Sequence, residues 1–566
     1  MLRLATLVSL VTLCLLPVEP SAHAQTSAAG PLTSTRSSIV AENAPGRLVV
    51  IYRSGHVPVE ADALLAASGA RPIRHLGKLG ISAVATSAAD EAGVRTRLAA
   101  IPEVATVLQD RVVRGHALAV SAASQNTRPS MARPSIVSAP TPAPTTTPRL
   151  VPRIFTSIGD KNLVPPAVVP PPADPVAPVA PTALYDTFYN SPQGWAVQQA
   201  GGYGANIAGG PASGPWNTSL GAGARIAILD SGVDATHPDI APNLVYQRSF
   251  IDQSANGEPS VCDDGSPQDQ SGHGTWVASL AAGAVGSGTG NVAGVAPQAS
   301  LLNIKVLERL PAATGTTPLA QCEAGQPGGL LSWVLAGIND AIEQHATVIV
   351  LSLGSVVDLT TGDGAGWKAQ FDSAAYAAEQ SGAVIVAAVG NDGLNLGGTR
   401  YIELPAQSRG VLPVVADTNP ACAENLAVNA TCAAGALTRA YYSNYGATGA
   451  IAAPGGSYPE GPDTGISGFV RGACSSGMTN TADGLPATTG SSLGCFGLGH
   501  VAYVQAMGTS AAAPLVAGAV AILRAERPNL TPAQIIALLQ STASASGKMA
   551  EPQLNLPAAL ASNQPQ

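Results

Sequence analysis

The chain has 566 residues, of which 46% are hydrophobic and only 11% are charged. A wholly disordered chain is excluded, because disorder goes with low hydrophobicity and high charge. The net charge of -8 gives no electrostatic support for binding nucleic acid. At about 150 residues per domain, the length predicts roughly three or four units.

The first 24 residues are typical of a secretory signal peptide. Arg3 gives a positive start, residues 4–16 are almost wholly apolar, and residues 22–24 (AHA) form a small-x-small cleavage site. This apolar run is shorter than the ~20 residues that a relaxed membrane span needs. We therefore expect a removed signal and a secreted product, extracellular or periplasmic, with a retained anchor as the alternative. Residues 25–46 are expected to be a flexible segment.

Residues 47–113 have the pattern of a small α+β domain. Strand-like runs lie at 47–52, 73–79, 81–86 and 104–113. Helical patterns lie at 59–68 and 90–100. The order β-α-β-β-α-β is that of a ferredoxin-like split unit.

Residues 114–183 are expected to form a proline-rich linker. Fifteen prolines fall between Pro129 and Pro181, with Thr, Ala and Val among them. Such a stretch cannot build a packed core and should be extended. The alternative is an ordered arm that crosses the surface of the next domain.

Residues 184–562 alternate between strand and helix patterns. Apolar strand-like runs lie at 224–229, 301–307, 347–353, 383–389 and 411–416. Helical segments lie at 274–282, 330–345, 366–381, 510–525 and 532–541. Strands that are apolar on both faces and separated by helices indicate an α/β fold, with a mainly parallel sheet covered by helices on both faces.

Three short segments carry side chains suited to catalysis. Asp230 ends an apolar strand, His273 lies between two glycines before a helix, and Ser510 begins a long apolar helix whose first turn is expected to hold Pro514. Alone, each has an ordinary explanation: a turn-forming Asp, a capping His or an N-cap Ser. Together they follow the order Asp…His…Ser, which is one of the orders found in convergent serine triads.

The chain resembles the subtilisin-like serine proteases, or subtilases. DSGVDATHPD at 230–239, SGHGTWVAS at 271–279 and GTSAAAPLVAG at 508–518 resemble the family's aspartate, histidine and serine motifs. Four connecting segments recur in the family's order, at 294–307, 348–355, 384–391 and 442–455. The resemblance covers residues 184–562, and residues 47–113 resemble the family's inhibitory propeptide more loosely.

The resemblance implies a mechanism for peptide-bond hydrolysis through an acyl-enzyme. Ser510 would be the nucleophile, His273 the general base and then acid, and Asp230 the residue that orients the imidazole. The Asn391 side chain would stabilise the oxyanion beside the N–H of Ser510. The residues implied in substrate binding are Ser352, Leu353 and Gly354, which would pair with an extended substrate, and Ala387, Ala388 and Gly390, which would form another pocket wall.

No cofactor is required for this chemistry, but the resemblance implies a structural calcium site. Asp239 matches a calcium ligand in many relatives, and the loop 283–293 could supply carbonyl oxygens. That loop has no carboxylate, so a simple turn role for Asp239 is the alternative.

Six cysteines remain once Cys14 is removed with the signal, an even number that suggests disulfides in an exported chain. No C-x-x-C spacing favours a zinc site. Free buried thiols are the alternative to disulfides. We expect sequential pairs: Cys262–Cys322, Cys422–Cys432 and Cys474–Cys495.

The sequence thus predicts a secreted serine endopeptidase made as an inactive precursor. The block 47–113 would assist folding and inhibit the enzyme until autocleavage within residues 114–183. We expect a monomer that acts on protein or peptide substrates, with no nucleic-acid partner and no membrane partner after signal removal. The alternatives are a processing protease of narrow specificity and a catalytically silent, peptide-binding relative.

Overall fold

The computed structural model describes residues 42–115, 194–204, 213–252, 260–285, 292–312, 315–418, 437–456, 470–478, 482–483, 494–498, 501–545 and 549–562. The predictions that lie outside these residues are the signal peptide, most of segment 25–46, the linker beyond Gly115, and the pairing of Cys422 with Cys432.

The N-terminal part has the predicted β-α-β-β-α-β order. Its elements are β1 (Asn43–Tyr52), α1 (Ala61–Ala67), β2 (Arg71–Leu76), β3 (Ile81–Ala85), α2 (Glu91–Ala99) and β4 (Val104–Gly115). The strands pair antiparallel in the order β4-β1-β3-β2. Leu48 and Val50 of β1 pack in the cluster that holds both helices, whereas Val49 and Ile51 belong to a second core cluster. This alternation is what a sheet buried on both faces requires.

Both ends of this part extend further than the sequence predicts. β1 begins at Asn43, which pairs with Arg111, so residues 43–46 are strand and not flexible. β4 continues to Gly115, so Arg114 and Gly115 belong to a strand and not to the linker. Their backbone groups pair with strands far away in the sequence, which local pattern could not indicate.

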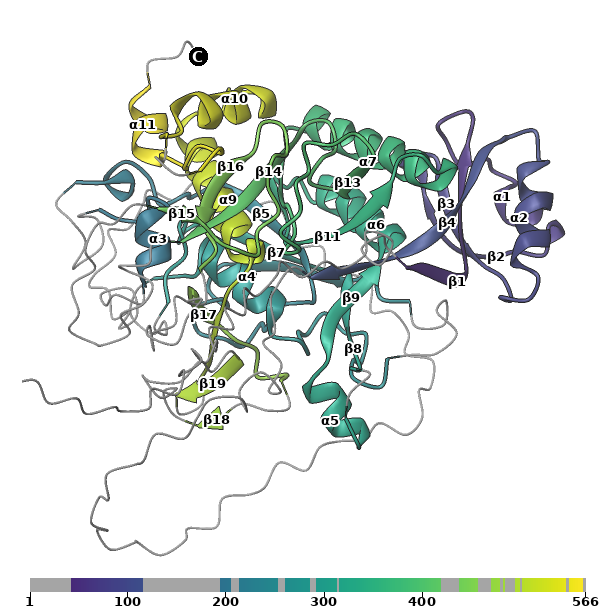
Figure 1. The fold of residues 1–566 in the computed structure, drawn as a ribbon, viewed down its shortest axis with the longest axis horizontal. Helices are drawn as coiled ribbons and strands as arrows, with labels where there is room; N and C mark the ends of the chain where they lie inside the picture. Colours follow the sequence, from purple (N-terminus) through teal and green to yellow (C-terminus); the bar gives the residue numbers. More distant parts are fainter. Residues whose placement is uncertain are drawn as a thin grey trace, which may run out of the picture. The chain divides into compact units, whose positions relative to one another are not determined.

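The larger part is built on a mainly parallel sheet (Figure 1). Its strands are β5 (Arg225–Asp230), β6 (Leu244–Ser249), β7 (Ser300–Lys305), β10 (Val348–Leu351), β12 (Val384–Ala388), β14 (Val411–Thr418), β15 (Thr438–Arg439) and β16 (Ile451–Pro454). Their order is β15-β14-β12-β10-β5-β7-β6, with β16 beside β14, and among the described pairs only β14 with β15 is antiparallel.

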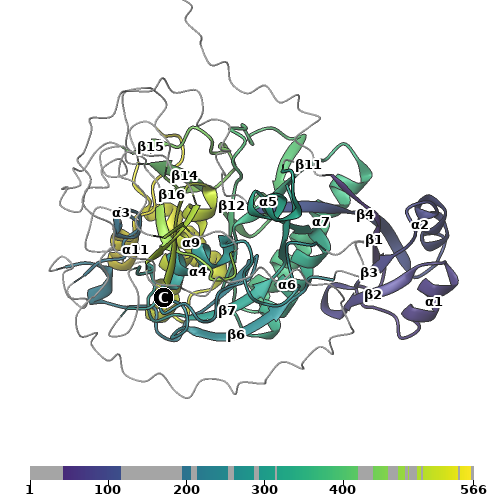
Figure 2. The ribbon, with the colours of Figure 1, turned by 90° about the horizontal axis from the view of Figure 1, so that it is seen from below.

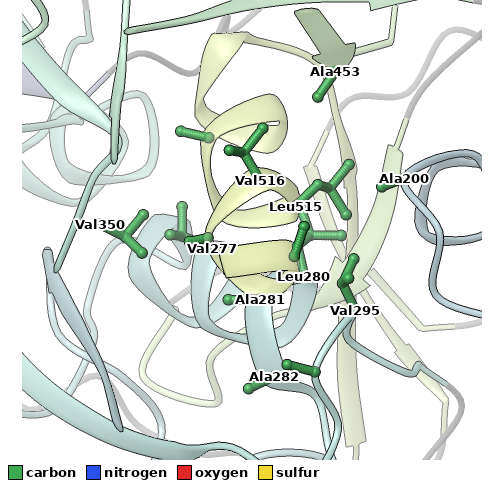
Figure 3. Packing of buried hydrophobic residues seen from close by; sticks show 14 of the residues in the cluster. Ala200, Val277, Leu280, Ala281, Ala282, Val295, Val350, Ala453, Leu515 and Val516 are labelled. Atoms are coloured by element: carbon green, nitrogen blue, oxygen red, sulfur yellow. The ribbon is translucent and has the colours of Figure 1, made fainter. Parts of the chain in front are cut away.

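Helices cover both faces of this sheet, as predicted (Figure 2). One face carries α3 (Trp195–Gln199), α4 (His273–Ala282), α9 (Thr509–Glu526), α10 (Pro532–Thr542) and α11 (Leu556–Ala561). The other face carries α6 (Leu331–Glu343) and α7 (Gly362–Gln380). Figure 3 shows α4 and α9 packed together through residues that include Val277, Leu280, Leu515 and Val516.

The helix α9 is a buried core helix. It is long and apolar enough to cross a membrane, but 83% of that stretch is buried inside the fold. Pro514 is its sixth residue, not part of its first turn as expected. A proline at this position cannot donate to the carbonyl four residues earlier, which belongs to Ser510.

A second sheet joins the N-terminal part to the larger part. Its further strands are β8 (Leu307–Leu310), β9 (Gln326–Leu330), β11 (Leu353–Asp358) and β13 (Tyr401–Leu404), and the short helix α5 (Pro318–Glu323) precedes β9. β4 pairs antiparallel with both β11 and β9, and β13 pairs with β11. The end of the N-terminal part is therefore a strand added to the larger part.

The segment before α9 forms a small sheet of its own. Its strands are β17 (Val470–Ala473), β18 (Ala482–Asp483), β19 (Gly494–Leu498) and β20 (Val501–Ala506), in the order β17-β20-β19-β18. Cys474 follows β17, and Cys495 lies in β19, so this insertion sheet (residues 470–506) carries one of the predicted disulfides.

Candidate active site

Three side chains that are far apart in the sequence form one hydrogen-bonded chain. Asp230 is the last residue of β5, His273 the first residue of α4 and Ser510 the second residue of α9. Nδ1 of His273 lies 2.6 Å from Oδ1 of Asp230, and Nε2 of His273 lies 2.9 Å from Oγ of Ser510. The end of a central strand and the starts of two helices meet here, at the edge where open α/β sheets place their sites.

The charges around His273 favour the protonated form of its imidazole. Burial alone would lower the pKa of His273, but the charge and hydrogen bond of Asp230 raise it, Asp269 adds to this, and the net direction is upward. Oδ1 of Asp230 also accepts a hydrogen bond from the N–H of Ser231 at 2.7 Å, which fixes the carboxylate. An imidazole held this way can take a proton from Ser510 and be stabilised once it has done so.

The backbone carbonyl of Ser510 accepts a hydrogen bond from a side chain outside its own helix. Because Pro514 has no N–H, the usual helical donor to this carbonyl is missing. The hydroxyl of Ser352 donates to it instead, at 3.0 Å, and Oγ of Ser510 lies 3.1 Å from the carbonyl oxygen of Ser352. Ser352 therefore fixes the start of α9 and gives the nucleophile a second acceptor.

The buried carboxylate of Asp269 organises the turn that leads into α4. It accepts five hydrogen bonds, from the N–H groups of Ser271, Gly272 and Thr275 and from the hydroxyls of Ser231 and Thr275. These bonds tie the segment before His273 to the segment after Asp230. Asp269 is not among the predicted site residues, and it does not occupy the capping position of α4, which is Gly272.

Asn391 lies beside the start of α9. Its Oδ1 accepts hydrogen bonds from the N–H of Thr509 at 3.0 Å and from the hydroxyl of Thr509 at 2.9 Å. Because the oxygen is engaged on Thr509, the NH₂ group is the end of the amide that can donate to a reacting group. This orientation suits the expected oxyanion donor.

The end of β4 lies between β11 and β9 and pairs with both, and we call this place between the two strands the groove. Arg114 pairs with Gly354 on one side and with Gly328 on the other, and Gly115 pairs with Leu353. A Cβ atom on Gly115 would lie 3.4 Å from Cε1 of His273, so the strand reaches the hydrogen-bonded chain. Of the predicted substrate-binding residues, Leu353 and Gly354 thus already pair with an extended strand.

The other predicted pocket residues are arranged less simply. Ala387 and Ala388 are fully buried, and they belong to the core clusters on opposite faces of the sheet. Their side chains cannot both face one pocket, because successive residues of a strand point to opposite sides. Gly390 comes two residues after the end of β12 with a φ of +96°, and as a glycine it offers only backbone atoms.

Asp239 is buried, and its surroundings are those of a hydrogen-bonded turn. Its Oδ2 lies 3.4 Å from the N–H of Val292, and its carbonyl accepts a hydrogen bond from Ala284. Among the described residues, which lack 286–291 of the neighbouring loop, no group of three His, Cys, Asp or Glu could hold a metal. The fit to calcium in this part of the chain is therefore incomplete.

Two of the three expected disulfides are formed within the described residues, Cys262–Cys322 and Cys474–Cys495. The second packs directly on the turn before His273: a Cβ on Gly272 would lie 2.8 Å from Sγ of Cys474.

The residues after Cys474 hold both acidic loops of the site. Ser475 donates through its hydroxyl to the carbonyl of Asp269, and Ser476 donates through its N–H and hydroxyl to Oδ2 of Asp234, each at 2.7 Å. The sequence predicts the pair Cys474–Cys495 here, but not the contact of this segment with the site.

Comparison with known proteins gives a consistent result. The model of the subtilase family matches residues 221–558. The chain is 35% identical over 178 residues to thermitase of Thermoactinomyces vulgaris, covering 31% of this chain and 51% of thermitase. It is 29% identical over 349 residues to an extracellular protease of Xanthomonas campestris pv. campestris, covering 58% of this chain and 49% of that protease. The chain spans about half the length of these curated relatives.

Comparison with solved structures shows that the fold is similar to that of an enzyme related to subtilisin. The crystal structure of fervidolysin from Fervidobacterium pennivorans, a keratinolytic enzyme related to subtilisin, superposes with a TM-score of 0.55 at 21% identity. The match covers 93% of this chain and 62% of fervidolysin, and at this identity it concerns the fold alone. The family match takes in more than half of the chain and contains Asp230, His273 and Ser510. The chain therefore belongs to the subtilase family of serine peptidases.

Proposed function

We propose that this protein is an exported serine endopeptidase made as a precursor that cleaves itself. The observation that carries the proposal is the hydrogen-bonded chain from Asp230 through His273 to Ser510, at the end of a groove that accepts an extended strand. Family membership supports a peptidase over a silent binding protein, because the three catalytic positions hold Asp230, His273 and Ser510.

The first half of the reaction uses the two ring nitrogens of His273 differently. Nδ1–H donates to Asp230, so Nε2 is the lone-pair nitrogen that accepts the proton of the Ser510 hydroxyl as Oγ attacks the substrate carbonyl carbon. The imidazolium then gives this proton to the leaving amine, and the acyl group stays on Oγ. In the second half, water takes the place of Ser510 and the same nitrogen is again the base.

The negative charge on the substrate oxygen needs donors placed in advance. The NH₂ group of Asn391 and the N–H of Ser510 are the proposed donors. Loss of one such donor costs about 3–4 kcal/mol of transition-state stabilisation, a magnitude that was itself measured on a subtilisin.

The N-terminal part is proposed to be the inhibitor and the first substrate. Gly115 pairs with Leu353, so the same register continued by one residue would set residue 116 opposite Ser352, which contacts Ser510. We therefore expect the first cut after His116, within the segment 114–183. N-terminal sequencing of the matured protein tests this, and a first cut elsewhere would contradict the register.

Export is proposed from the signal-like residues 1–24 and from the disulfides, which persist in oxidising compartments. No step of the mechanism uses a metal. Chelation with EDTA should leave kcat of the matured enzyme unchanged, and calcium bound near Asp239 would be revealed by a lower Tm.

The experiment that tests the function labels the nucleophile. Purified protein is treated with a serine-directed phosphonate, and the adduct is located by mass spectrometry. Labelling at Ser510, abolished together with casein hydrolysis and precursor maturation in Ser510→Ala, is the expected result. Ser541, an exposed serine of α10, provides the control: Ser541→Ala should label and mature normally. An unlabelled, intact wild-type precursor would overturn the proposal.

A further inference from the structure

Gly115 is the residue of β4 that lies against the imidazole of His273, and its backbone conformation is open to any residue. It is not among the glycines with a positive φ, so no left-handed backbone requires a glycine here. What can occupy this place is therefore decided by space. A substrate that paired with β11 and β9 as β4 does would bring one of its own residues to the same place.

Two rings leave no room for a side chain at this place. A Cβ atom on Gly115 would lie 2.7 Å from Cγ and 3.4 Å from Cβ of Pro327, and 3.4 Å from Cε1 of His273. Carbon atoms are in optimal contact at about 3.5–4.0 Å, so the shortest of these distances is a clash. The clashing atom belongs to a proline ring, which is closed on its own backbone and cannot swing aside as the end of a flexible side chain can.

The proline is held at a fixed distance from the histidine through Arg309. In the pairing of β8 with β9, Arg309 lies opposite Pro327. The buried guanidinium of Arg309 donates to the carbonyl of Gln270 at 2.8 Å, three residues before His273, and to the carbonyl of Glu323 at 2.9 Å. These hydrogen bonds tie β8 and α5 to the turn that leads into α4. Pro327 and His273 are therefore two walls whose spacing is fixed by the fold.

We propose that Pro327 makes the peptidase selective for substrates with glycine at the position that lies against His273. This inference rests on the proposed peptidase function and names its substrate class, which is extended segments that carry glycine at this one position. A larger residue would have to displace the backbone of β9 or turn the imidazole. Turning the imidazole would lengthen its hydrogen bonds to Asp230 and Ser510, so the cost falls on the base as well as on binding.

The first test uses the chain's own cleavage. Gly115→Ala adds only the Cβ atom, so autocleavage of the precursor, followed by gel electrophoresis, should slow by roughly 5- to 100-fold, the range for overpacking a rigid site. Pro327→Ala removes the clashing ring atom, and in the double variant it should restore most of the rate. Gly77→Ala is the matched control, because Gly77 lies in the same part with nothing within 4 Å of an added Cβ and no positive φ.

The second test uses the matured enzyme on a library of peptides from a denatured proteome, with the cuts located by mass spectrometry. For the wild-type enzyme, glycine should be enriched at one fixed position before the cut. Pro327→Ala should accept alanine and serine at that position. Labelling of this variant at Ser510 by a phosphonate shows that its active site is folded.

The outcomes separate this inference from the peptidase function. Wild-type cuts without glycine enrichment would overturn the inference and leave the function intact, and this result needs no variant. Autocleavage of Gly115→Ala at the wild-type rate would overturn it as well. Slow autocleavage that Pro327→Ala does not restore would show that Pro327 is not the residue that selects glycine. A wild-type enzyme that cuts no peptide and is not labelled contradicts the function itself.

Discussion

The imidazole of His273 is influenced by two carboxylates that reach it in different ways. Asp230 touches it directly at 2.6 Å, whereas Asp269 acts through its charge and through the turn that it organises. Both favour the protonated ring, and together they outweigh the burial that opposes it. The same two residues therefore set the geometry of the base and its proton affinity.

This balance has a consequence for the pH dependence of activity. His273 must be neutral to accept the proton of Ser510, so activity is lost as pH falls through its pKa. Because that pKa is raised, the acid limb of kcat/KM should lie above the ordinary histidine value of about 6.5. A pH profile with an uncharged peptide measures it. A limb below that value, with the wild-type fold intact by circular dichroism, would contradict the assignment.

Gly272 is the residue at which the disulfide and the histidine turn meet. Its φ is +81°, and an added Cβ would lie 2.8 Å from Sγ of Cys474. In Gly272→Ala we expect the left-handed backbone to cost about 1 kcal/mol of unfolding free energy, and crowding to cost about 1–3 kcal/mol more. Displacement of His273 should also lower kcat, measured after active-site titration.

Gly223 supplies the matched control for this substitution. Its φ is +86°, but nothing lies within 4 Å of an added Cβ. Gly223→Ala should therefore show the backbone cost alone, with unchanged kcat. Equal unfolding free energies for the two variants, measured by denaturant titration, would show that Cys474 does not constrain the turn.

The residues that carry the chemistry could be predicted from sequence, whereas those that hold them could not. Asp230, His273 and Ser510 lie in short motifs whose residues are contiguous. The contacts of Asp269 with Ser231, and of Ser352 with the carbonyl of Ser510, join segments that meet only in the fold. No local pattern contains this information.

At the scale of elements, the predicted strand 347–353 is divided at Ser352, a residue that contacts Ser510. Apart from Thr347 and Ser352 the run is apolar and predicts one strand, but the structure forms β10 and β11 with Ser352 between them. β10 belongs to the parallel sheet, whereas β11 belongs to the second sheet, where it pairs with β4 and β13. Periodicity could not indicate the break, because both halves are buried.

Two other elements are set by context more than by propensity. β9 contains Pro327, Gly328 and Gly329, which disfavour a strand, and it is formed by pairing with β4 and β8. α7 begins at Gly362, earlier than the predicted 366, because the hydroxyl of Thr361 accepts a hydrogen bond from the N–H of Gly364 and caps the helix.

The insertion sheet should matter more for activity than for stability. Cys474–Cys495 closes a sequence separation of 21 residues and Cys262–Cys322 one of 60 residues. In the chain-entropy model these are worth about 3 and about 4 kcal/mol. We therefore expect the double variant Cys262→Ser/Cys322→Ser to lose more unfolding free energy.

Activity should follow the opposite order. Cys474 contacts the turn before His273, and its neighbours hold Asp269 and Asp234. Cys474→Ser/Cys495→Ser should therefore show the larger loss of kcat at a temperature where both double variants are folded. A loss of kcat that simply follows the loss of unfolding free energy would reject a specific role for the insertion sheet.

At the scale of the whole molecule, the N-terminal part is attached by more than the strand in the groove. Asp110 of β4 is fully buried, and it accepts hydrogen bonds from the N–H of Ser332, at 3.2 Å, and from the Ser332 hydroxyl in the first turn of α6. Within the N-terminal part, its charge also offsets that of Arg47, a buried residue of β1 whose pKa is lowered by burial. A further contact with the larger part is the ion pair between Arg95 and Asp363 at the start of α7.

These contacts should control how long the cleaved N-terminal part stays bound. In Asp110→Ala, the N–H and the hydroxyl of Ser332, in the first turn of α6, lose their acceptor in the N-terminal part. Leaving buried donors without an acceptor costs about 1–3 kcal/mol. Much of that cost should appear as faster release, because dissociation rates carry most effects of interface mutations. The lag between autocleavage, followed by gel electrophoresis, and the appearance of peptidase activity should therefore shorten by roughly 5- to 100-fold.

The control removes an exposed acid whose ion pair lies within the N-terminal part. Asp90 pairs with Arg97 at 2.7 Å on an exposed surface, where an ion pair is worth less than about 1 kcal/mol. Asp90→Asn should leave the lag unchanged. If Asp110→Ala matured with the wild-type lag while Arg95→Ala shortened it, the attachment would depend on α7 and not on the capped turn of α6. If neither variant changed the lag, release would be governed by the strand in the groove, and the contacts of Asp110 would serve folding alone.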